Sequence, residues 1–206
     1  KRFSWLCHLF LGLGLSLAPV GAFLAVHGSL EWLPVLYAIA VVSWVAGFDI
    51  IYALQDIDFD KSQQLQSIPA RFGMKRALWI SGILHTLCAL AILWAAWLLH
   101  RDYGLNDGIY IGSILFIVLL AFQHFVIGRG DLSKVNMAFF TTNGMASIAL
   151  AAAVILDFYC WIEYPERFIK ASRDEKRVVT KSKLTTDLIS NVASDNTFEK
   201  VPRGVG

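Results

Sequence analysis

Residues 33–55 read LPVLYAIAVVSWVAGFDIIYALQ, and Asp49 is the single charged residue in this stretch. A helix of about 20 apolar residues crosses the roughly 30 Å of hydrocarbon in a bilayer. Surface helices of soluble proteins have one polar face, whereas this stretch is apolar nearly all round. Four further stretches share this character, near residues 5–26, 77–99, 109–127 and 135–156. The sequence therefore predicts an all-α fold, a polytopic bundle of five transmembrane helices.

The composition supports a membrane domain followed by a polar tail. Of the 206 residues, 56% are hydrophobic and 17% are charged, whereas soluble domains carry about 25% charged residues. The charged residues that do occur are concentrated after the last apolar stretch. We therefore expect a transmembrane domain over residues 1–157 and a disordered or weakly structured tail over 158–206. Nothing in the sequence resembles a nucleic-acid-binding surface, and the net charge is only +2.

Basic residues outside the predicted spans indicate the orientation of the chain in the membrane. One side carries eight of them, contributed by Lys1, Arg2 and the connections 56–76 and 128–134. The connections on the opposite side carry only Arg101. Because basic residues are enriched in cytoplasmic loops, we expect the first side to face the cytoplasm.

The second stretch ends in a run of aspartates, GFDIIYALQDIDFD, at residues 47–60. If the helix continues at about 100° per residue, one narrow face carries Asp49, Tyr52, Asp56 and Asp60. Asp58 falls on the opposite face, and we expect it to be solvated or to cap the helix. A carboxylate in the membrane zone costs about 2.5–3.5 kcal/mol unless it is compensated, so this face needs a cation.

Two kinds of cation could compensate the acidic face. One is a basic side chain that folds back to form ion pairs, and the candidates are Lys61, Arg71, Lys75 and Arg76. The other is Mg²⁺, which prefers oxygen ligands and usually takes one or two carboxylates together with phosphate oxygens. The spacing of the aspartates leaves both alternatives open.

Four segments of the chain together resemble one family of membrane enzymes. They are the run 47–60, Lys1-Arg2-Phe3-Ser4 with the stretch after it, SIPARFG at 67–73, and Asn143-Gly144. These segments resemble the UbiA superfamily of intramembrane prenyltransferases, whose second aspartate-rich motif is similar to residues 47–60. The resemblance covers residues 1 to about 157. It implies that the five spans correspond to helices five to nine of a nine-helix fold.

The resemblance implies a reaction and a site. In this family, Mg²⁺ held by two aspartate-rich motifs draws charge onto a prenyl diphosphate, and the resulting allylic carbocation alkylates an acceptor ring. By resemblance, Asp56 and Asp60 are the principal metal ligands, and Asp49 assists them. Tyr52 would line the same cavity. The residues that would bind substrate are Lys1, Arg2, Lys61, Arg71 and Asn143.

The segment 67–73 looks closest to the 4-hydroxybenzoate branch and the futalosine-pathway menaquinone branch of the family. We therefore expect two substrates, a polyprenyl diphosphate that enters from the lipid bilayer and an aromatic acid of the 4-hydroxybenzoate type. The product would serve ubiquinone or menaquinone biosynthesis. The expected location is a bacterial inner membrane, with the active site facing the cytoplasm.

One part of the family pattern does not occur in the sequence. The first aspartate-rich motif, NDxxDxxxD, belongs to the second helix of the family and is absent from residues 1–206. The chain also begins at Lys1 without a methionine. We therefore interpret the chain as the C-terminal half of a larger protein. Its partner would be the missing N-terminal half, and this half alone would be inactive.

Two other classes of function fit an apolar bundle with an acidic face. A transporter or channel subunit could bind a cation at residues 49–60, but it would be expected to contain related repeats, and none is seen. A membrane scaffold would tolerate Asp56→Asn. Three histidines lie in or beside the spans without ligand spacing on one helix, and we expect them to be packing residues: His8, His85 and His124.

Overall fold

The computed structural model describes residues 1–128 and 135–163, and all of the regular structure in this part is helical. The elements are α1 (Cys7–His27), α2 (Trp32–Tyr52), η1 (Ala53–Asp56), α3 (Ile57–Ser62), α4 (Ile68–Tyr103), α5 (Gly108–Ile127), η3 (Met137–Thr142) and α6 (Asn143–Glu163). Residues 1–161 form one compact unit, to which the contacts below belong. The expectations for residues 129–134 and for the tail from residue 164 fall outside the described residues, while α6 itself continues past residue 157.

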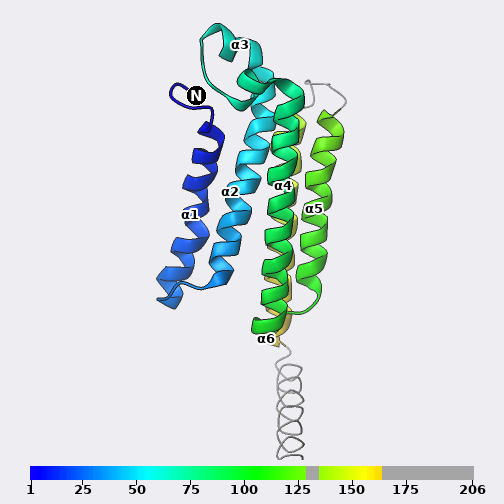
Figure 1. The fold of residues 1–206 in the computed structure, drawn as a ribbon. Coiled ribbons are helices and arrows are strands. Elements are labelled where there is room, and N and C mark those ends of the chain that lie inside the picture. Colours follow the sequence, from blue (N-terminus) through cyan, green and yellow to red (C-terminus); the bar gives the residue numbers. More distant parts are fainter. Residues whose placement is uncertain (129–134, 164–206) are drawn as a thin grey trace, which may run out of the picture. The chain divides into compact units, whose positions relative to one another are not determined.

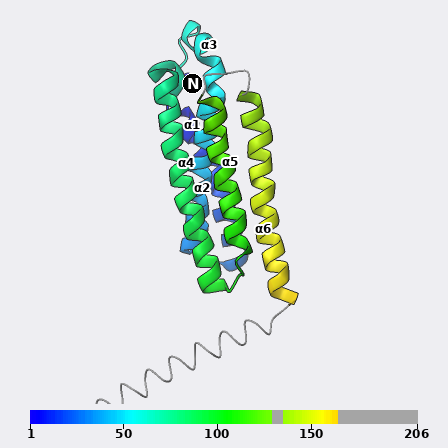
Figure 2. The same ribbon diagram turned by 90° about the vertical axis from the view of Figure 1, so that its right-hand side faces the viewer.

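The five predicted spans are confirmed. Five helical segments are long and apolar enough to cross a membrane: Cys7–His27, Trp32–Ser62, Ile68–Tyr103, Gly108–Ile127 and Phe139–Cys160. Figure 1 shows α1 beside α2 at one edge of the bundle, with α4 and α5 following. The turned view in Figure 2 shows α6 beside α5. The start of the chain and α3 lie at the same end of the bundle (Figure 1), so this end gathers the residues of the predicted site.

Small residues allow the helices to approach closely, as membrane bundles require. A Cβ atom added at Gly12 of α1 would lie 2.6 Å from the carbonyl oxygen of Val42 in α2. A Cβ atom at Gly112 of α5 would overlap Ala153 of α6. These contacts bring α1 against α2 and α5 against α6.

The connection predicted over residues 56–76 is largely helical, so this part of the prediction was wrong. It contains α3 and the first turns of α4. Ser67 caps α4, because its Oγ accepts a hydrogen bond from the backbone N–H of Ala70 at 3.2 Å. Pro69 is tolerated in the first turn, where its missing N–H is not needed. Gly73 then interrupts the helix at φ 78° and ψ 166°, a backbone conformation that is almost confined to glycine.

A buried apolar cluster holds the acidic end of α2 in place. It consists of Ile50, Ile51, Leu54, Ile68, Ala77, Ile127 and Val135. The first three members lie between Asp49 and Asp56 in the sequence. Burial of these side chains against α4 and α5 therefore turns the aspartates away from the cluster, toward the start of the chain and α1.

Candidate active site

The aspartate run does not form one continuous α-helix. α2 ends at Tyr52, the 3₁₀ turn η1 follows, and α3 continues after it. Because a 3₁₀ helix has 3.0 residues per turn instead of 3.6, the side chains after η1 are rotated from their predicted positions. Asp56 and Asp60 nevertheless share one partner, and Asp58 is exposed as expected. Asp49 and Tyr52 contact other parts of the bundle.

Lys1 is the cation that compensates Asp56 and Asp60. Its Nζ lies 2.9 Å from Oδ2 of Asp56, and 3.3 Å and 3.2 Å from Oδ1 and Oδ2 of Asp60. The Asp60 side chain is only 1% exposed, whereas that of Asp56 is 42% exposed. Burial by itself would lower the pKa of Lys1, but its hydrogen bonds to the two aspartates and their negative charges raise that pKa above its usual value. Lys1 is therefore held in its charged form.

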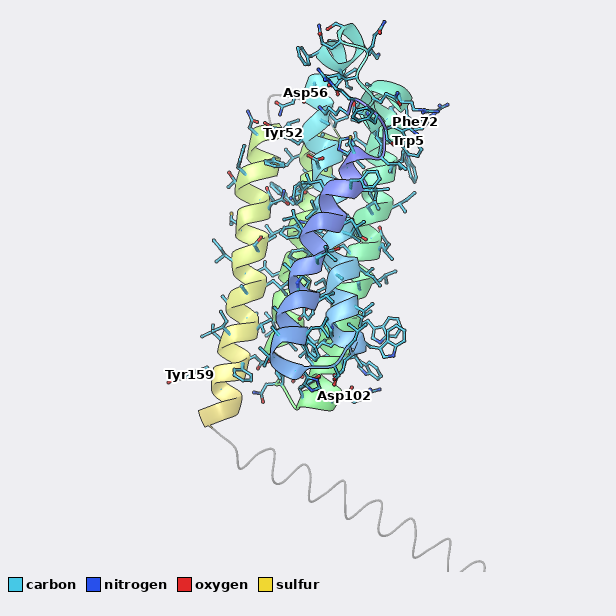
Figure 3. All side chains as sticks on the ribbon, turned by 90° about the vertical axis from the view of Figure 1, so that its left-hand side faces the viewer. Trp5, Tyr52, Asp56, Phe72, Asp102 and Tyr159 are labelled. Atoms are coloured by element: carbon cyan, nitrogen blue, oxygen red, sulfur yellow. The ribbon has the colours of Figure 1, made fainter. Side chains whose placement is uncertain are left out.

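The basic residues that the sequence offered as partners for the aspartates have other surroundings. In the described part of the chain, none of them forms an ion pair with an aspartate: Lys61, Arg71, Lys75 and Arg76. The guanidinium of Arg71 instead lies 5.5 Å from the ring centres of both Trp5 and Phe72. Figure 3 shows these two rings together at the end of the bundle where Asp56 lies. Arg2 and Lys61 are exposed.

Hydrogen bonds of Ser67 and Gln66 connect Asp60 and Lys1 to the start of α4. The hydroxyl of Ser67 donates a hydrogen bond to Oδ2 of Asp60 at 2.7 Å. The backbone N–H of Gln66 donates to the carbonyl oxygen of Lys1 at 2.7 Å. The start of the chain is thereby joined to the segment 60–67, and the buried Asp60 carboxylate has two partners, Lys1 and Ser67. Sequence analysis missed this role of Ser67, although a serine just before Ile-Pro is a typical start of a helix.

Replacing Ser67 by alanine should destabilise the protein by about 1–3 kcal/mol, because it removes a helix cap and leaves an oxygen of buried Asp60 without its hydroxyl donor. Thermal unfolding in detergent measures the effect. Ser62→Ala is the matched control, since the Ser62 hydroxyl is exposed, donates to the carbonyl of Phe59 and accepts from the side chain of neighbouring Gln63, and touches no carboxylate among the described residues. Equal unfolding temperatures for the two variants would contradict the assigned role of Ser67.

Asp49 has a partner that the sequence did not reveal. Its Oδ2 lies 2.7 Å from Nδ1 of His8, which comes from α1. The His8 side chain is 1% exposed, and its Nε2 has no hydrogen-bond partner in the described part of the protein. A buried histidine of α1 is thus the hydrogen-bond partner of the carboxylate that lies within α2. No helical periodicity could have paired these two residues, because 41 positions separate them.

Tyr52 and Asn143 lie in aromatic and amide surroundings rather than against the aspartates. The ring of Tyr52 packs on Phe139 at a centroid distance of 4.3 Å. The Oδ1 atom of buried Asn143 accepts hydrogen bonds from Nε1 of Trp44, at 3.3 Å, and from Nε2 of Gln123. Because the Trp44 indole can only donate, this contact fixes which way the Asn143 amide faces. Its Nδ2 is left buried without a partner among the described residues.

A second polar contact inside the bundle joins His85 of α4 to His124 of α5. The Nδ1 atom of His85 lies 2.9 Å from Nε2 of His124. Gly47 makes room for this pair, because a Cβ atom there would overlap the His85 ring. The expectation that these histidines are packing residues fits this arrangement, although their contact with each other could not be read from the sequence.

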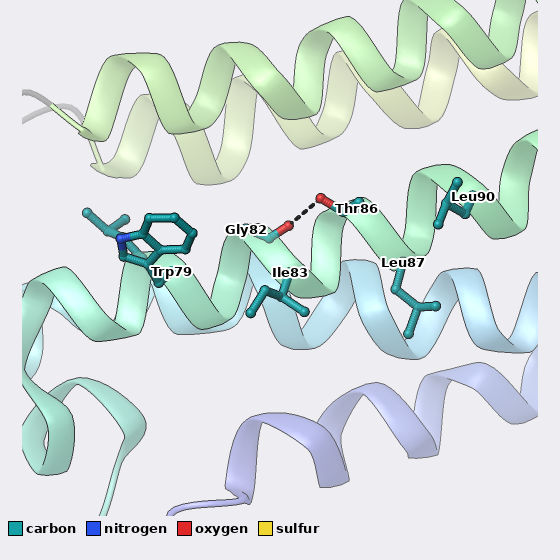
Figure 4. Close-up of a pocket in the computed structure, with 7 residues that line it drawn as sticks. Trp79, Gly82, Ile83, Thr86, Leu87 and Leu90 are labelled. Atoms are coloured by element: carbon teal, nitrogen blue, oxygen red, sulfur yellow. Dashed lines mark hydrogen bonds between the residues drawn. The ribbon is translucent and has the colours of Figure 1, made fainter.

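Two hollows in the described part of the bundle are almost wholly apolar. A cavity of about 540 Å³ lies between α2, α4, α5 and α6, and its lining includes Tyr37, Trp44, Cys88, Phe116, Leu150 and Val154. A groove of about 610 Å³ runs along α4 (Figure 4), where the Thr86 hydroxyl donates to the carbonyl of Gly82 at 2.9 Å. Exposed Trp79 and Ile83 line this groove, as expected for a surface in contact with lipid.

Asp56 and Asp60 fit the chemistry of a magnesium site. Their hard carboxylate oxygens converge on one cation, and Mg²⁺ usually combines one or two carboxylates with phosphate oxygens. Asp49, the assisting ligand of the family pattern, contacts His8 instead. Among the described residues, no group of three or more His, Cys, Asp or Glu side chains is arranged to hold an ion. A metal here would need further oxygen ligands, such as those of a diphosphate.

Five apolar spans and a carboxylate pair at the end of the second span define an integral membrane protein with an acidic end. Residues 1–160 match the UbiA prenyltransferase family. The chain therefore belongs to this family, and the resemblance found in its motifs is confirmed.

Individual relatives agree with this assignment. The chain is 30% identical over 156 residues to a 4-hydroxybenzoate octaprenyltransferase of Xylella fastidiosa (strain M12), covering 73% of this chain and 50% of the relative. It is 29% identical over 159 residues to the enzyme of the same description from Vibrio campbellii, covering 77% and 54%. The apo structure of a UbiA homolog from Aeropyrum pernix K1 has a TM-score of 0.64 and 32% identity, covering 77% and 57%. The chain thus spans about half the length of the curated relatives it matches.

Proposed function

We propose that the protein transfers a polyprenyl group from a prenyl diphosphate to an aromatic acid of the 4-hydroxybenzoate type, in ubiquinone or menaquinone biosynthesis. The observation that carries the proposal is the convergence of Asp56 and Asp60 on one cation, within a chain of the UbiA family. The relatives described as 4-hydroxybenzoate octaprenyltransferases support the reaction and the acceptor. Family membership favours a transferase over the transporter, channel or scaffold.

In the proposed site, Asp56 and Asp60 would hold Mg²⁺, with Asp49 as an assisting acid. Bound Mg²⁺ would supply the positive charge that stabilises the diphosphate as a leaving group. Ser67 keeps the Asp60 carboxylate in position for this task. Positive charge at the same end of the bundle would attract the diphosphate and the acceptor carboxylate, and it comes from Lys1, Arg2, Lys61 and Arg71.

Aromatic and amide groups close to the acidic end could interact with the allylic carbon and with an oxygen of the substrate. The faces of aromatic rings stabilise a nearby cation, so the packed rings of Tyr52 and Phe139 would favour positive charge at the allylic carbon. Asn143 has a buried Nδ2 with no partner in the described part, and this donor would be available to an oxygen of the substrate. Both assignments extend the family pattern to these positions.

Further parts of the proposal concern the rest of the protein and its location. Because the chain matches about half of its relatives' length, we propose that the remaining metal ligands come from the N-terminal half of the family fold, with its first aspartate-rich motif. This chain alone would then be inactive. The acidic end would face the cytoplasm of a bacterial inner membrane, because Lys1, Arg2 and the basic residues of the segment 61–76 lie at that end.

The proposal is tested by the transfer of a radiolabelled prenyl group to 4-hydroxybenzoate, catalysed by the complete gene product in native-like membranes. We expect product in the presence of Mg²⁺, loss of product with EDTA, and recovery when Mg²⁺ is added in excess. EDTA already saturated with Mg²⁺ is the control. Product that forms despite EDTA would overturn the metal dependence. If no prenyl group is transferred to 4-hydroxybenzoate or to any of a panel of other aromatic acids, the proposed transferase activity is overturned.

A further inference from the structure

We propose that the Lys1 ammonium is a built-in substitute for the metal. It would hold Asp56 and Asp60 together while no metal is bound, and it would leave their oxygens when a metal and a diphosphate enter. This inference rests on the proposed function and deepens it. It gives Lys1 a role in controlling metal binding, in addition to the contact with substrate that the family pattern implies.

The ammonium and a metal would need the same carboxylate oxygens. Nζ of Lys1 lies 2.9 Å from Oδ2 of Asp56 and 3.2 Å from Oδ2 of Asp60. Magnesium binds oxygen at about 2.0–2.1 Å, so an ion on Oδ2 of Asp56 would lie within about 5 Å of Nζ. Two positive charges this close repel each other, and the burial of Asp60 reduces the screening by water. The ammonium therefore competes with a metal for this pair.

The structure allows Lys1 to withdraw without unfolding the site. The backbone of Lys1 is anchored, because its carbonyl accepts a hydrogen bond from Gln66. The lysine side chain is a flexible four-carbon stem, and here it is 31% exposed. Ser67 continues to hold Asp60 after the ammonium has left. A change of side-chain rotamer is thus enough to open the carboxylate pair.

Competition of this kind couples metal binding to diphosphate binding. Without a diphosphate, displacing the ammonium leaves it with no anionic partner, so the affinity for free metal is low. With a diphosphate present, the displaced ammonium gains phosphate oxygens as new partners. Each ligand therefore raises the affinity for the other, and this coupling is reciprocal. The site would stay closed to metal until its substrate arrives.

Binding of Mn²⁺, measured by electron paramagnetic resonance, tests the proposal without any assay of activity. The complete gene product is placed in nanodiscs of uncharged phosphatidylcholine, so that the lipid itself binds no Mn²⁺. We expect Lys1→Met to bind Mn²⁺ about tenfold more tightly than the wild type when no diphosphate is present, because a competing charge is gone. Adding inorganic pyrophosphate should tighten Mn²⁺ binding in the wild type and do so much less in the variant.

Three controls separate the possible outcomes. Lys75→Met removes an exposed charge that forms no ion pair with a carboxylate of the described residues, and it should leave the Mn²⁺ affinity unchanged. Lys1→Gln repeats the test with a polar side chain, and unfolding temperatures confirm that each variant is folded. Unchanged or weaker Mn²⁺ binding in both Lys1 variants would overturn the substitute role. If Asp56→Asn/Asp60→Asn binds Mn²⁺ as the wild type does, the proposed metal site fails, and the substitute role fails with it.

Discussion

Replacing Asp56 and Asp60 together by asparagine is expected to lower kcat/KM for prenyl transfer by at least about 10³-fold, because the variant loses the charge that would hold the proposed metal at the leaving group. Asparagine has nearly the same shape and can still accept the hydrogen bond from Ser67. The loss should therefore be one of chemistry rather than of folding. Transfer of a radiolabelled prenyl group to 4-hydroxybenzoate measures it.

Asp58→Asn is the matched control for the double variant. Asp58 lies in the sequence between the two proposed ligands and is exposed, and its replacement by asparagine removes one carboxylate charge from the same end of the bundle. It should keep activity near that of the wild type. Equal product from the double variant and the wild type would remove these carboxylates from catalysis. It would also favour the alternative that the protein is a membrane scaffold, because a scaffold would tolerate the replacement of these aspartates.

Replacing Gly47 by alanine is expected to destabilise the protein by about 1–3 kcal/mol, since an extra methyl group in a tight core forces its neighbours to move. The new Cβ would overlap the ring of His85. That ring is buried and tied to His124, so it has little freedom to shift. Thermal unfolding in detergent reports the loss.

Gly14→Ala provides the comparison for Gly47→Ala. A Cβ atom at Gly14 of α1 would have no atom of the described residues within 4 Å apart from its own stretch of helix backbone, so this variant should unfold at or slightly above the wild-type temperature. A Gly47→Ala protein as stable as Gly14→Ala would show that the contact between α2 and α4 is looser than the structure describes.

The carboxylates of the acidic run do not all have the same surroundings. Asp49 is paired with a buried histidine of α1, and Asp56 and Asp60 share the ammonium at the start of the chain. Asp58 is exposed and needs no partner. The pair with the shared cation is the one that a divalent ion could occupy. The distribution of partners therefore singles out Asp56 and Asp60 more sharply than their spacing does.

The spans, the acidic run and the family were predictable from the sequence alone. A helix of about 20 apolar residues satisfies its own backbone hydrogen bonds and can cross a bilayer wherever its neighbours lie. Membrane spans are therefore a local property of the sequence. The run 47–60 and the segment 67–73 are likewise contiguous motifs, which the family comparison confirms over residues 1–160.

Only the tertiary structure decided which side chain meets which carboxylate. Lys1 lies 55 positions from Asp56, and His8 lies 41 positions from Asp49, so helical periodicity has no bearing on either pair. The 3₁₀ turn η1 also broke the predicted single face, and the cap at Ser67 turned a predicted loop into helix. The sequence determined the elements and their chemistry, because these depend on neighbouring residues. The pairing of charges depends on how the helices pack, so the fold determined it.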